Sequence, residues 1–387
     1  MAILLFIVGL FLFIGLIVVH EFGHFIAARR SGVKAEEFGI FFPPRLYKRK
    51  MKGGWLFTIN LLPLGGFVRL KGEHDTDTAP GSFGAASLWS KTKIMAAGVV
   101  MNLLVAYLLL VILALIGMPQ LVPNQYTIKN DAKTTKDEIM VSYVEPNSPA
   151  SHAGLQYRDQ IVAIGLPGQE QLLTGSTHLQ DITKKYAGKL VDVRFKHDGQ
   201  TVTQNVVLRS AADVAASQKT SSPKGYLGVA PTEFTIVRST WSAPIVAAGT
   251  IAQYTALTFQ GLGHALGGLG SIIAGASTGN ATARQHGQEA AGQVSGPVGI
   301  YEILKGGSAL GYQFMLLIIA VISLTLAIMN ILPIPALDGG RLWITLVARA
   351  LKRPLSARTE ETVNAIGFVV LLCLIVVITV VDVKRFF

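Results

Sequence analysis

Two histidines and a glutamate near the N-terminus have residue types and a spacing that suit metal binding. His20, Glu21 and His24 form a His-Glu-X-X-His motif. Residues i and i+4 lie on one face of a helix, so both imidazoles can point at a single metal ion. The alternative is a pair of interfacial histidines at the end of an anchor helix.

The motif lies in an apolar segment that is long enough to enter a membrane. Residues 2–19 are an unbroken run of apolar residues and glycines, and they lead directly into His20. Ionisable groups at membrane depth are costly, and they usually face a protein interior or a water-filled cavity. This location favours metal binding over a chance match to a short pattern.

A second unusual segment, residues 330–340, follows another apolar run. Pro333 and Pro335 remove backbone donors and clash with the preceding turn, and the glycines at 339 and 340 permit open conformations. The segment therefore cannot continue as a regular helix. Irregular backbone at membrane depth is tolerated where protein buries it or where it lines an aqueous cavity.

The carboxylate in this break is Asp338. Together with His20 and His24 it would give a three-ligand zinc site that leaves the fourth position for water. The alternative is a helix that stops at the cytoplasmic surface, with Asp338 merely solvated.

Composition indicates an integral membrane protein. Half of the 387 residues are hydrophobic, 15% are charged and the mean hydropathy is +0.46. The lone cysteine, Cys373, excludes an intramolecular disulfide and a thiolate metal cluster. Four apolar runs have the length of a membrane span, at about residues 2–19 (continuing as helix to 30), 94–116, 314–332 and 366–381. The first run lacks a basic n-region and a cleavage site, so we interpret it as a retained span.

The distribution of charge predicts a topology. A net charge of +11 would suggest nucleic-acid binding in a soluble protein, but here the basic residues concentrate in short loops beside the spans. The positive-inside rule places the loops at residues 29–71 and 349–358 in the cytoplasm. Both termini and the long central segment then lie outside. The histidine motif and the Pro-rich break fall at cytoplasmic helix ends, at similar depth.

The loop after the first span reads as a hairpin. Residues 55–59 and 67–70 are expected to be short strands around a turn that contains Gly65 and Gly66. Such a hairpin could dip towards the metal, or it could be an ordinary surface hairpin.

The central segment reads as a soluble module. Residues 126–209 show hydrophobic alternation with turn signals between the runs. A strand is expected at 139–144, a helix at 177–186 and a hairpin around Asp198-Gly199 at 190–208. The stretch 155–164 resembles the part of a PDZ domain that leads from a Gly-Leu pair into a strand.

The motif at residues 20–24, taken with Leu337-Asp338-Gly339-Gly340, resembles the site-2 protease family of intramembrane metalloproteases. Residues 60–68 are similar to that family's loop after the first span, and residues 295–300 to the element before its third core span. The order of elements matches bacterial members that insert a PDZ domain between the second and third core spans.

One departure from the family pattern concerns the second span. Members often carry a Gly-Pro pair shortly before an asparagine, whereas here Gly98 is followed by Val99 ahead of Asn102. The role of Asn102 therefore stays open.

The resemblance implies an α-helical polytopic membrane protein with four transmembrane helices, a membrane-associated β-hairpin and an inserted extracytoplasmic PDZ (α+β) domain. The expected domains are an N-terminal membrane core, a PDZ domain, interfacial amphipathic helices with a linker, and a C-terminal membrane core, at residues 1–117, 126–230, 231–312 and 313–387 respectively. Residues 241–278 could be an interfacial helix pair or could span the membrane. We favour the interfacial position, because an extra span would separate Asp338 from the histidines.

The resemblance also implies roles for the site residues. His20, His24 and Asp338 would hold Zn²⁺, and Glu21 would take a proton from the attacking water and pass it to the leaving amine. Substrate-binding roles are expected for five residues, namely Asn330, Pro333, Pro335, Gly65 and Gly66. For Asn330 the alternative is helix–helix hydrogen bonding within the bundle.

The predicted function is regulated intramembrane proteolysis in the bacterial cytoplasmic membrane. Substrates would be single-span membrane proteins, such as anti-sigma factors already trimmed outside, or remnant signal peptides. The expected partners also include membrane lipid and a peptide or substrate segment at the PDZ domain, which could instead exclude bulky substrates by size. No nucleic-acid partner is expected.

Two alternative functions make different demands on the sequence. A non-proteolytic zinc-binding PDZ scaffold would not need the general base Glu21, so the presence of that glutamate argues against it. A metal transporter predicts further ionisable residues in the other spans, but residues 94–116 and 366–381 offer none before Asp382.

Overall fold

The computed structural model describes residues 2–73, 77–122, 124–157, 159–197, 200–218, 223–278, 296–352 and 356–386. The chain divides into two compact units. The membrane unit comprises Met1–Leu113 and Ala243–Phe387, and the inserted unit comprises Ala114–Ser242. The predicted turn at Asp198-Gly199, residue Ser295 and most of the linker before it lie outside the described residues.

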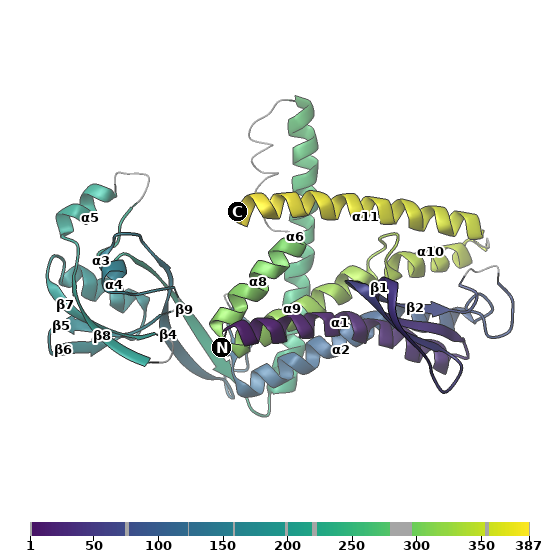
Figure 1. The fold of residues 1–387 in the computed structure, drawn as a ribbon, viewed down its shortest axis with the longest axis horizontal. Coiled ribbons are helices and arrows are strands. Elements are labelled where there is room, and N and C mark those ends of the chain that lie inside the picture. Colours follow the sequence, from purple (N-terminus) through teal and green to yellow (C-terminus); the bar gives the residue numbers. More distant parts are fainter. Residues whose placement is uncertain are drawn as a thin grey trace. The chain divides into compact units, whose positions relative to one another are not determined.

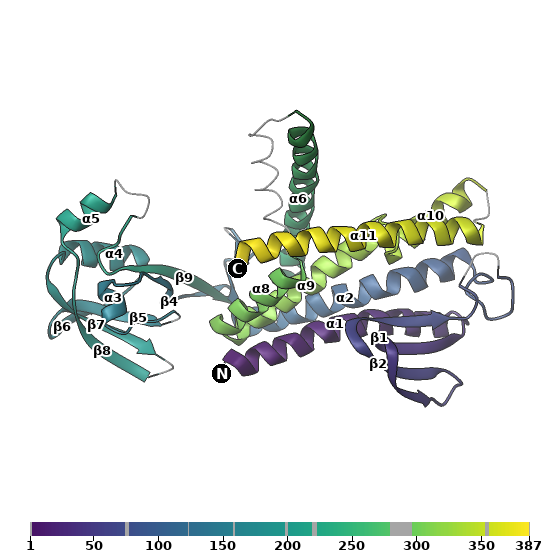
Figure 2. The same cartoon turned by 45° about the horizontal axis from the view of Figure 1, so that its top comes forward.

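Four helices of the membrane unit are long and apolar enough to cross a membrane, which confirms the predicted spans. They are α1 (Ala2–Arg30), α2 (Leu88–Ile116), α9 (Tyr312–Ile331) and α11 (Ala357–Phe386). In both views α1, α2 and α9 run side by side (Figures 1 and 2). In the most apolar 18-residue stretch of α9 half of the residues are buried inside the protein, whereas in that of α11 the share is 11%. Helix α9 is therefore the central helix of the unit and α11 a peripheral one.

Three further helices accompany the spans, namely α6 (Ala243–Thr278), α8 (Pro297–Leu310) and α10 (Asp338–Ala350). The predicted pair of helices at 241–278 is wrong, because α6 is one continuous helix of 36 residues. Neither a proline beyond its first turn nor a glycine with positive φ interrupts it. Helix α6 is not among the four helices that qualify as spans.

The loop after α1 forms a sheet from two long, bent strands, β1 (Ala35–Lys50) and β2 (Leu56–Leu70). Phe38 of β1 pairs with Phe57 on one side and with Val68 on the other. The hairpin predicted from residues 55–59 and 67–70 is therefore wrong in its pairing, since both segments pair with β1 and not with each other. Strand β1 was not predicted from the sequence, because Pro43 and Pro44 interrupt the alternation of apolar and polar residues in this segment.

Because both strands bend, the sheet consists of four strand segments side by side. The segment 56–60 pairs with both 45–50 and 37–40, and 37–40 pairs in turn with 66–70. Segments 45–50 and 66–70 are therefore the two edges. Helix α1 contacts both strands, so the sheet packs beside the helix that carries the histidine motif.

The inserted unit is an antiparallel sheet with short helices. The strand order is β3-β9-β4-β5-β7-β8, and β6 pairs with β5. The strands are β3 (Met118–Pro119), β4 (Lys133–Val144), β5 (Gln160–Leu166), β6 (Gln169–Leu172), β7 (Leu190–His197), β8 (Gln200–Val207) and β9 (Val229–Arg238). The helices are α3 (Pro149–His152), α4 (Ser176–Lys185) and α5 (Ala211–Ser217).

Alternation along the strands gives this unit its core. In β7 the side chains of Val191, Val193 and Phe195 are buried and their neighbours are not, as expected for a sheet with one covered face. They join Ile161 and Ile164 of β5 in one hydrophobic cluster. The strand predicted at 139–144, the helix at 177–186 and the two strands of the 190–208 hairpin are confirmed.

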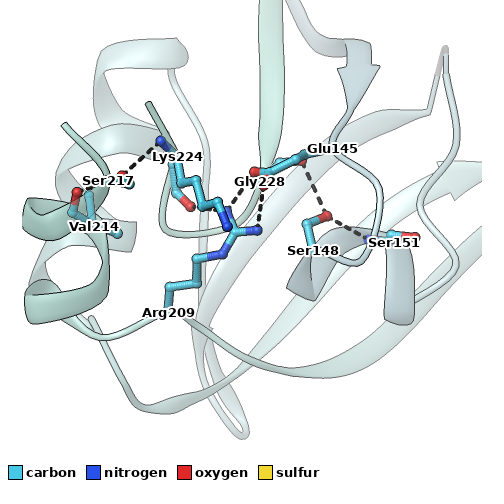
Figure 3. A network of polar contacts seen from close by, with 9 residues as sticks. Glu145, Ser148, Ser151, Arg209, Val214, Ser217, Lys224 and Gly228 are labelled. Atoms are coloured by element: carbon cyan, nitrogen blue, oxygen red, sulfur yellow. Dashed lines mark hydrogen bonds and ion pairs between the residues drawn. The ribbon is translucent and has the colours of Figure 1, made fainter. Parts of the chain in front are cut away.

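An ion-pair network fixes the segment that leads into β9 (Figure 3). The Arg209 guanidinium donates to both carboxylate oxygens of Glu145, at 2.6 and 2.9 Å, and to the Gly225 carbonyl at 2.9 Å. The backbone N–H of Glu145 donates to the Gly228 carbonyl at 2.9 Å. Bidentate arginine–carboxylate pairs combine strength with a fixed geometry, so residues 225–228 are held on their carbonyl side.

Candidate metal centre

Helix α1 carries the histidine motif as one regular helical turn. His20 and His24 lie one above the other, with ring centroids 4.9 Å apart. Each residue is only 9% exposed. The prediction that both imidazoles share one helix face is confirmed.

Asp338 reaches this pair because the chain breaks between α9 and α10. Helix α9 ends at Ile331, and Asp338 is the first residue of α10. Within the break Ala336 has a φ of 72°, a left-handed conformation that is unusual for a residue with a side chain. The predicted interruption of the helix is confirmed.

The two glycines after Asp338 act through close approach. A Cβ on Gly339 would lie 2.3 Å from the Leu332 carbonyl oxygen, and one on Gly340 would lie 2.1 Å from that of Ile334. Both glycines lie in the first turn of α10 and are buried. The expectation that they supply open backbone conformations is therefore wrong, because they let α10 fold back tightly onto the chain that precedes it.

The three predicted ligands converge. Asp338 Oδ2 lies 2.9 Å from His20 Nε2 and 3.0 Å from His24 Nε2, and the two Nε2 atoms are 3.2 Å apart. Zinc bonds of 2.0–2.1 Å in a tetrahedron place ligand atoms about 3.3 Å apart. Two imidazoles and a carboxylate at these separations fit one zinc ion.

Electrostatics at Asp338 suit a ligand. Burial acts to raise the pKa of its carboxyl group, but hydrogen bonds with His20 and His24 outweigh burial and hold that pKa below its ordinary value. Its position at the start of α10 adds the favourable end of the helix dipole. Asp338 is therefore ionised at neutral pH, as a metal ligand must be.

Glu21 lies between the ligand pair and the β-sheet. A Cβ on Gly66 would be 3.0 Å from Glu21 Cγ, so the sheet approaches the Glu21 side chain at Gly66. Gly65 faces elsewhere, because its missing Cβ leaves room for the Phe42 ring. Of the two predicted glycines, Gly66 is the one beside Glu21.

The remaining predicted residues lie around the break and outside this cluster. Asn330 is in the last turn of α9 and partly buried, and its side-chain amide has no hydrogen-bond partner among the described residues. Pro333 lies within the break. Pro335 packs against Gly367 of α11, where an added Cβ would come within 2.4 Å of the proline Cβ.

Helix α2 lies against both histidines through Gly98 and Asn102, and the sequence left the role of Asn102 open. A Cβ on Gly98 would lie 2.4 Å from His24 Nε2 and 2.6 Å from His20 Nε2. The Asn102 amide nitrogen is 3.3 Å from His20 Nδ1. Their spacing of four residues, which puts both on one helix face, was the available signal.

A buried His-Glu-X-X-His pair joined by an aspartate, on helices apolar enough to span a membrane, defines a membrane metalloprotease. The chain belongs to Peptidase family M50, whose model matches residues 8–374. It is a zinc metalloprotease with zinc as its cofactor.

Relatives match over nearly the whole chain. A Clostridium perfringens protein that bears the name zinc metalloprotease is 28% identical, covering 97% of each chain. The regulator of sigma-W protease RasP of Bacillus subtilis is 27% identical, covering 96% of each chain. The zinc metalloprotease RasP of Shouchella clausii is 26% identical, covering 96% of this chain and 97% of its own.

Proposed function

We propose that this intramembrane protease hydrolyses peptide bonds within or near the transmembrane segment of single-span membrane proteins. The observation that carries the proposal is the convergence of His20, His24 and Asp338 beside Glu21, on helices that qualify as membrane spans. These three residues would hold zinc, and Glu21 would act as the general base. When bound, zinc would polarise the scissile carbonyl and activate a water molecule.

Two features support this role for Glu21. It follows a ligand directly in the sequence, and its carboxylate interacts electrostatically with both imidazoles and Asp338. It would accept a proton from the attacking water and return it to the leaving amine. Gly66, which has no side chain, lies against Glu21.

The β-sheet offers a way to present an extended substrate. A helical substrate hides its peptide bonds, so part of it must unwind before hydrolysis. Segment 66–70 is an edge of the sheet and lies against Glu21. An unwound segment could add to this edge as a further strand, held by backbone hydrogen bonds. Asn330, Pro333, Pro335 and Gly65 would line its path.

The inserted unit would act as an extracytoplasmic PDZ domain, with 126–230 as its main part. A hollow of about 420 Å³ lies between α4 and the start of β9. Among its lining residues are Leu179, Val229, Lys184 and Lys224. Strand β3 pairs with β9 only at Ile236 and Val237, so within the described residues the start of β9 keeps an edge for an added strand.

The two lysines would favour a peptide with a free carboxylate. A substrate end newly exposed by an earlier cut has this chemistry, which fits an anti-sigma factor trimmed outside or a remnant signal peptide. The name of the Bacillus relative, regulator of sigma-W protease, supports a regulatory role. The protein would lie in the bacterial cytoplasmic membrane, with the inserted unit and both termini outside and the loops at 29–71 and 349–358 inside.

The test is cleavage of a tagged single-span substrate in cells that co-express the protein. Glu21→Gln should abolish cleavage and keep zinc bound, and Asp338→Ala should abolish cleavage and lose zinc. Glu36→Gln is the matched control, because Glu36 is exposed and lies outside the cluster. Equal cleavage by all four proteins would reject the assigned site. Zinc binding without cleavage of any single-span substrate would favour a scaffold.

A further inference from the structure

We infer that Asn102 of α2 is a positioning residue that fixes the proton of His20 on Nδ1, so that Nε2 is free for zinc. Gly98, one turn earlier, would keep the space for the ion. The inference rests on the proposed zinc site.

Asn102 is a polar side chain in an apolar helix, and it is only 1% exposed. Its amide nitrogen contacts His20 Nδ1 at 3.3 Å. Its amide oxygen has no hydrogen-bond partner among the described residues. A buried amide with one unsatisfied end destabilises a fold. Asn102 therefore does not serve stability, and we assign its role to the contact with His20.

The two ends of an amide are interchangeable in shape, and the hydrogen-bond network decides which end faces a partner. Among the described residues, His20 is the hydrogen-bond partner of the Asn102 amide. If the amide nitrogen donated to Nδ1, the proton of neutral His20 would sit on Nε2 and block metal binding. With the amide turned, its oxygen accepts the Nδ1 proton and the Nε2 lone pair is available for the zinc ion.

His24 shows the same arrangement with a backbone partner. Its Nδ1 lies 2.7 Å from the Ile94 carbonyl oxygen, which can only accept. With zinc bound, the Nε2 atom of neutral His24 would therefore carry the lone pair, on the side where Asp338 Oδ2 lies. Metal-bound histidines usually donate their second ring N–H to a carbonyl or carboxylate group. Asn102 would supply for His20 what Ile94 supplies for His24.

One side of α2 provides the carbonyl that contacts His24, the space at Gly98 and the amide that contacts His20. Ile94, Gly98 and Asn102 are spaced four residues apart, so they lie along one side of the helix. At Gly98 a side chain would occupy the space between the two Nε2 atoms. The Ser323 hydroxyl of α9 donates to the backbone carbonyl of Asn102 at 2.7 Å, so Ser323 contacts this side of α2 without contacting the Asn102 amide or either histidine.

The experiment measures zinc affinity of the full-length protein in detergent, by competition with a chelator. Asn102→Leu should weaken zinc binding by about 10–100-fold, the range for outer partners of metal ligands. Asn102→Asp, whose carboxylate can only accept, should stay close to wild type. Ser323→Ala is the matched control, since Ser323 is buried in the same interface without touching either histidine, and it should bind zinc normally.

The cobalt-substituted protein gives a second readout. The visible absorption of bound Co²⁺ should change in Asn102→Leu and stay unchanged in Ser323→Ala, because it reports the geometry around His20. If Asn102→Leu does not fold, Asn102→Ser replaces it, since a hydroxyl is too short to reach Nδ1. The inference would be overturned if Asn102→Leu, or Asn102→Ser in its place, bound zinc as tightly as wild type. It would also be overturned if Asn102→Asp lost as much zinc affinity as Asn102→Leu. Failure of wild type to bind zinc, or of His20→Ala to weaken it, would instead refute the proposed site.

Discussion

The two halves of the metal centre are held in different ways. His20 and His24 are placed by the regular geometry of α1, with α2 as a wall behind them. Asp338 is placed by a broken backbone, by two glycines that allow close approach, and by the contacts of Arg341 one turn further on. A half that rests on helical periodicity should tolerate small changes at positions of its helix that no other element packs against, such as Gly15. A half that rests on tertiary packing should not.

The largest effect is expected at Gly340. Gly340→Ala would place a Cβ 2.1 Å from the Ile334 carbonyl oxygen, and this backbone cannot yield without moving Asp338. A displacement of about 1 Å at a reacting centre can lower the rate roughly 100-fold. Zinc affinity and cleavage should both fall. Gly15→Ala on α1, where nothing lies within 4 Å of the added Cβ, should leave both unchanged. Similar losses in the two variants would remove the distinction between the halves.

A smaller effect is expected from Arg341→Gln. The guanidinium donates to Glu360 Oε1 at 3.1 Å, lies 3.7 Å from Glu73 Oε2 and covers the Phe83 ring at 4.8 Å. It therefore ties α10 to α11 and to the loop before α2. Loss of these partly buried contacts should destabilise the protein by roughly 2 kcal/mol, which thermal unfolding in detergent would detect.

The control for Arg341 is Arg349→Gln. Arg349 is exposed on the same helix, so its loss should leave the unfolding temperature as it is. If both variants unfold at the wild-type temperature, the Arg341 contacts do not hold the Asp338 half.

Gly66→Ala tests whether the sheet positions the proposed general base, Glu21, without affecting the zinc ligands. The new Cβ would lie 3.0 Å from Glu21 Cγ and 3.2 Å from the Gly39 carbonyl oxygen, a crowding that a few tenths of an ångström relieve. We expect kcat to fall by about tenfold, which corresponds to roughly 1.4 kcal/mol in the barrier, with zinc affinity unchanged. Gly65→Ala crowds the Phe42 ring to the same degree and should affect kcat less. Zinc loss in Gly66→Ala would show that the sheet supports the ligands instead of the base.

The smallest effect concerns a carboxylate in the inserted unit. Asp131 accepts hydrogen bonds from the backbone N–H and hydroxyl groups of Thr240 and Ser242. Desolvation acts to raise its pKa, but these hydrogen bonds lower it below its ordinary value. Because the folded-state pKa is depressed, the contribution of Asp131 to stability is present at neutral pH. It is lost as the pH falls below about 4, the unfolded value, towards the folded one.

Thermal unfolding between pH 7 and pH 3 tests this expectation. Asp131→Asn should lower the unfolding temperature slightly at pH 7, and the difference from wild type should begin to shrink as the pH falls below about 4. A difference of the same size at pH 7 and at pH 3 would show that Asp131 acts by shape and not by charge. Asp338 also has a lowered pKa, but its partners are imidazoles from another helix, so its loss should remove zinc as well.

The sequence was sufficient where the governing interactions are local. The spacing of His20 and His24, the length of the apolar runs and the helix-breaking prolines act within a few residues. These features led to four spans, a paired histidine face and a break before Asp338. Alternation likewise located β7 of the inserted unit, because the period-2 burial of Val191, Val193 and Phe195 can be read from the sequence of that one strand.

Only the tertiary structure decided what lies opposite those local features. The pairing of Phe38 with both Phe57 and Val68 depends on how two bent strands stack, and hydrophobic pattern alone does not choose between partners. The place of Asn102 beside His20, 82 residues away in sequence, depends on how closely α2 approaches α1. That approach is set by absent side chains such as the missing Cβ of Gly98. Helical periodicity acts through neighbouring residues and can be read from the chain, whereas close packing acts through space and appears only when the helices meet.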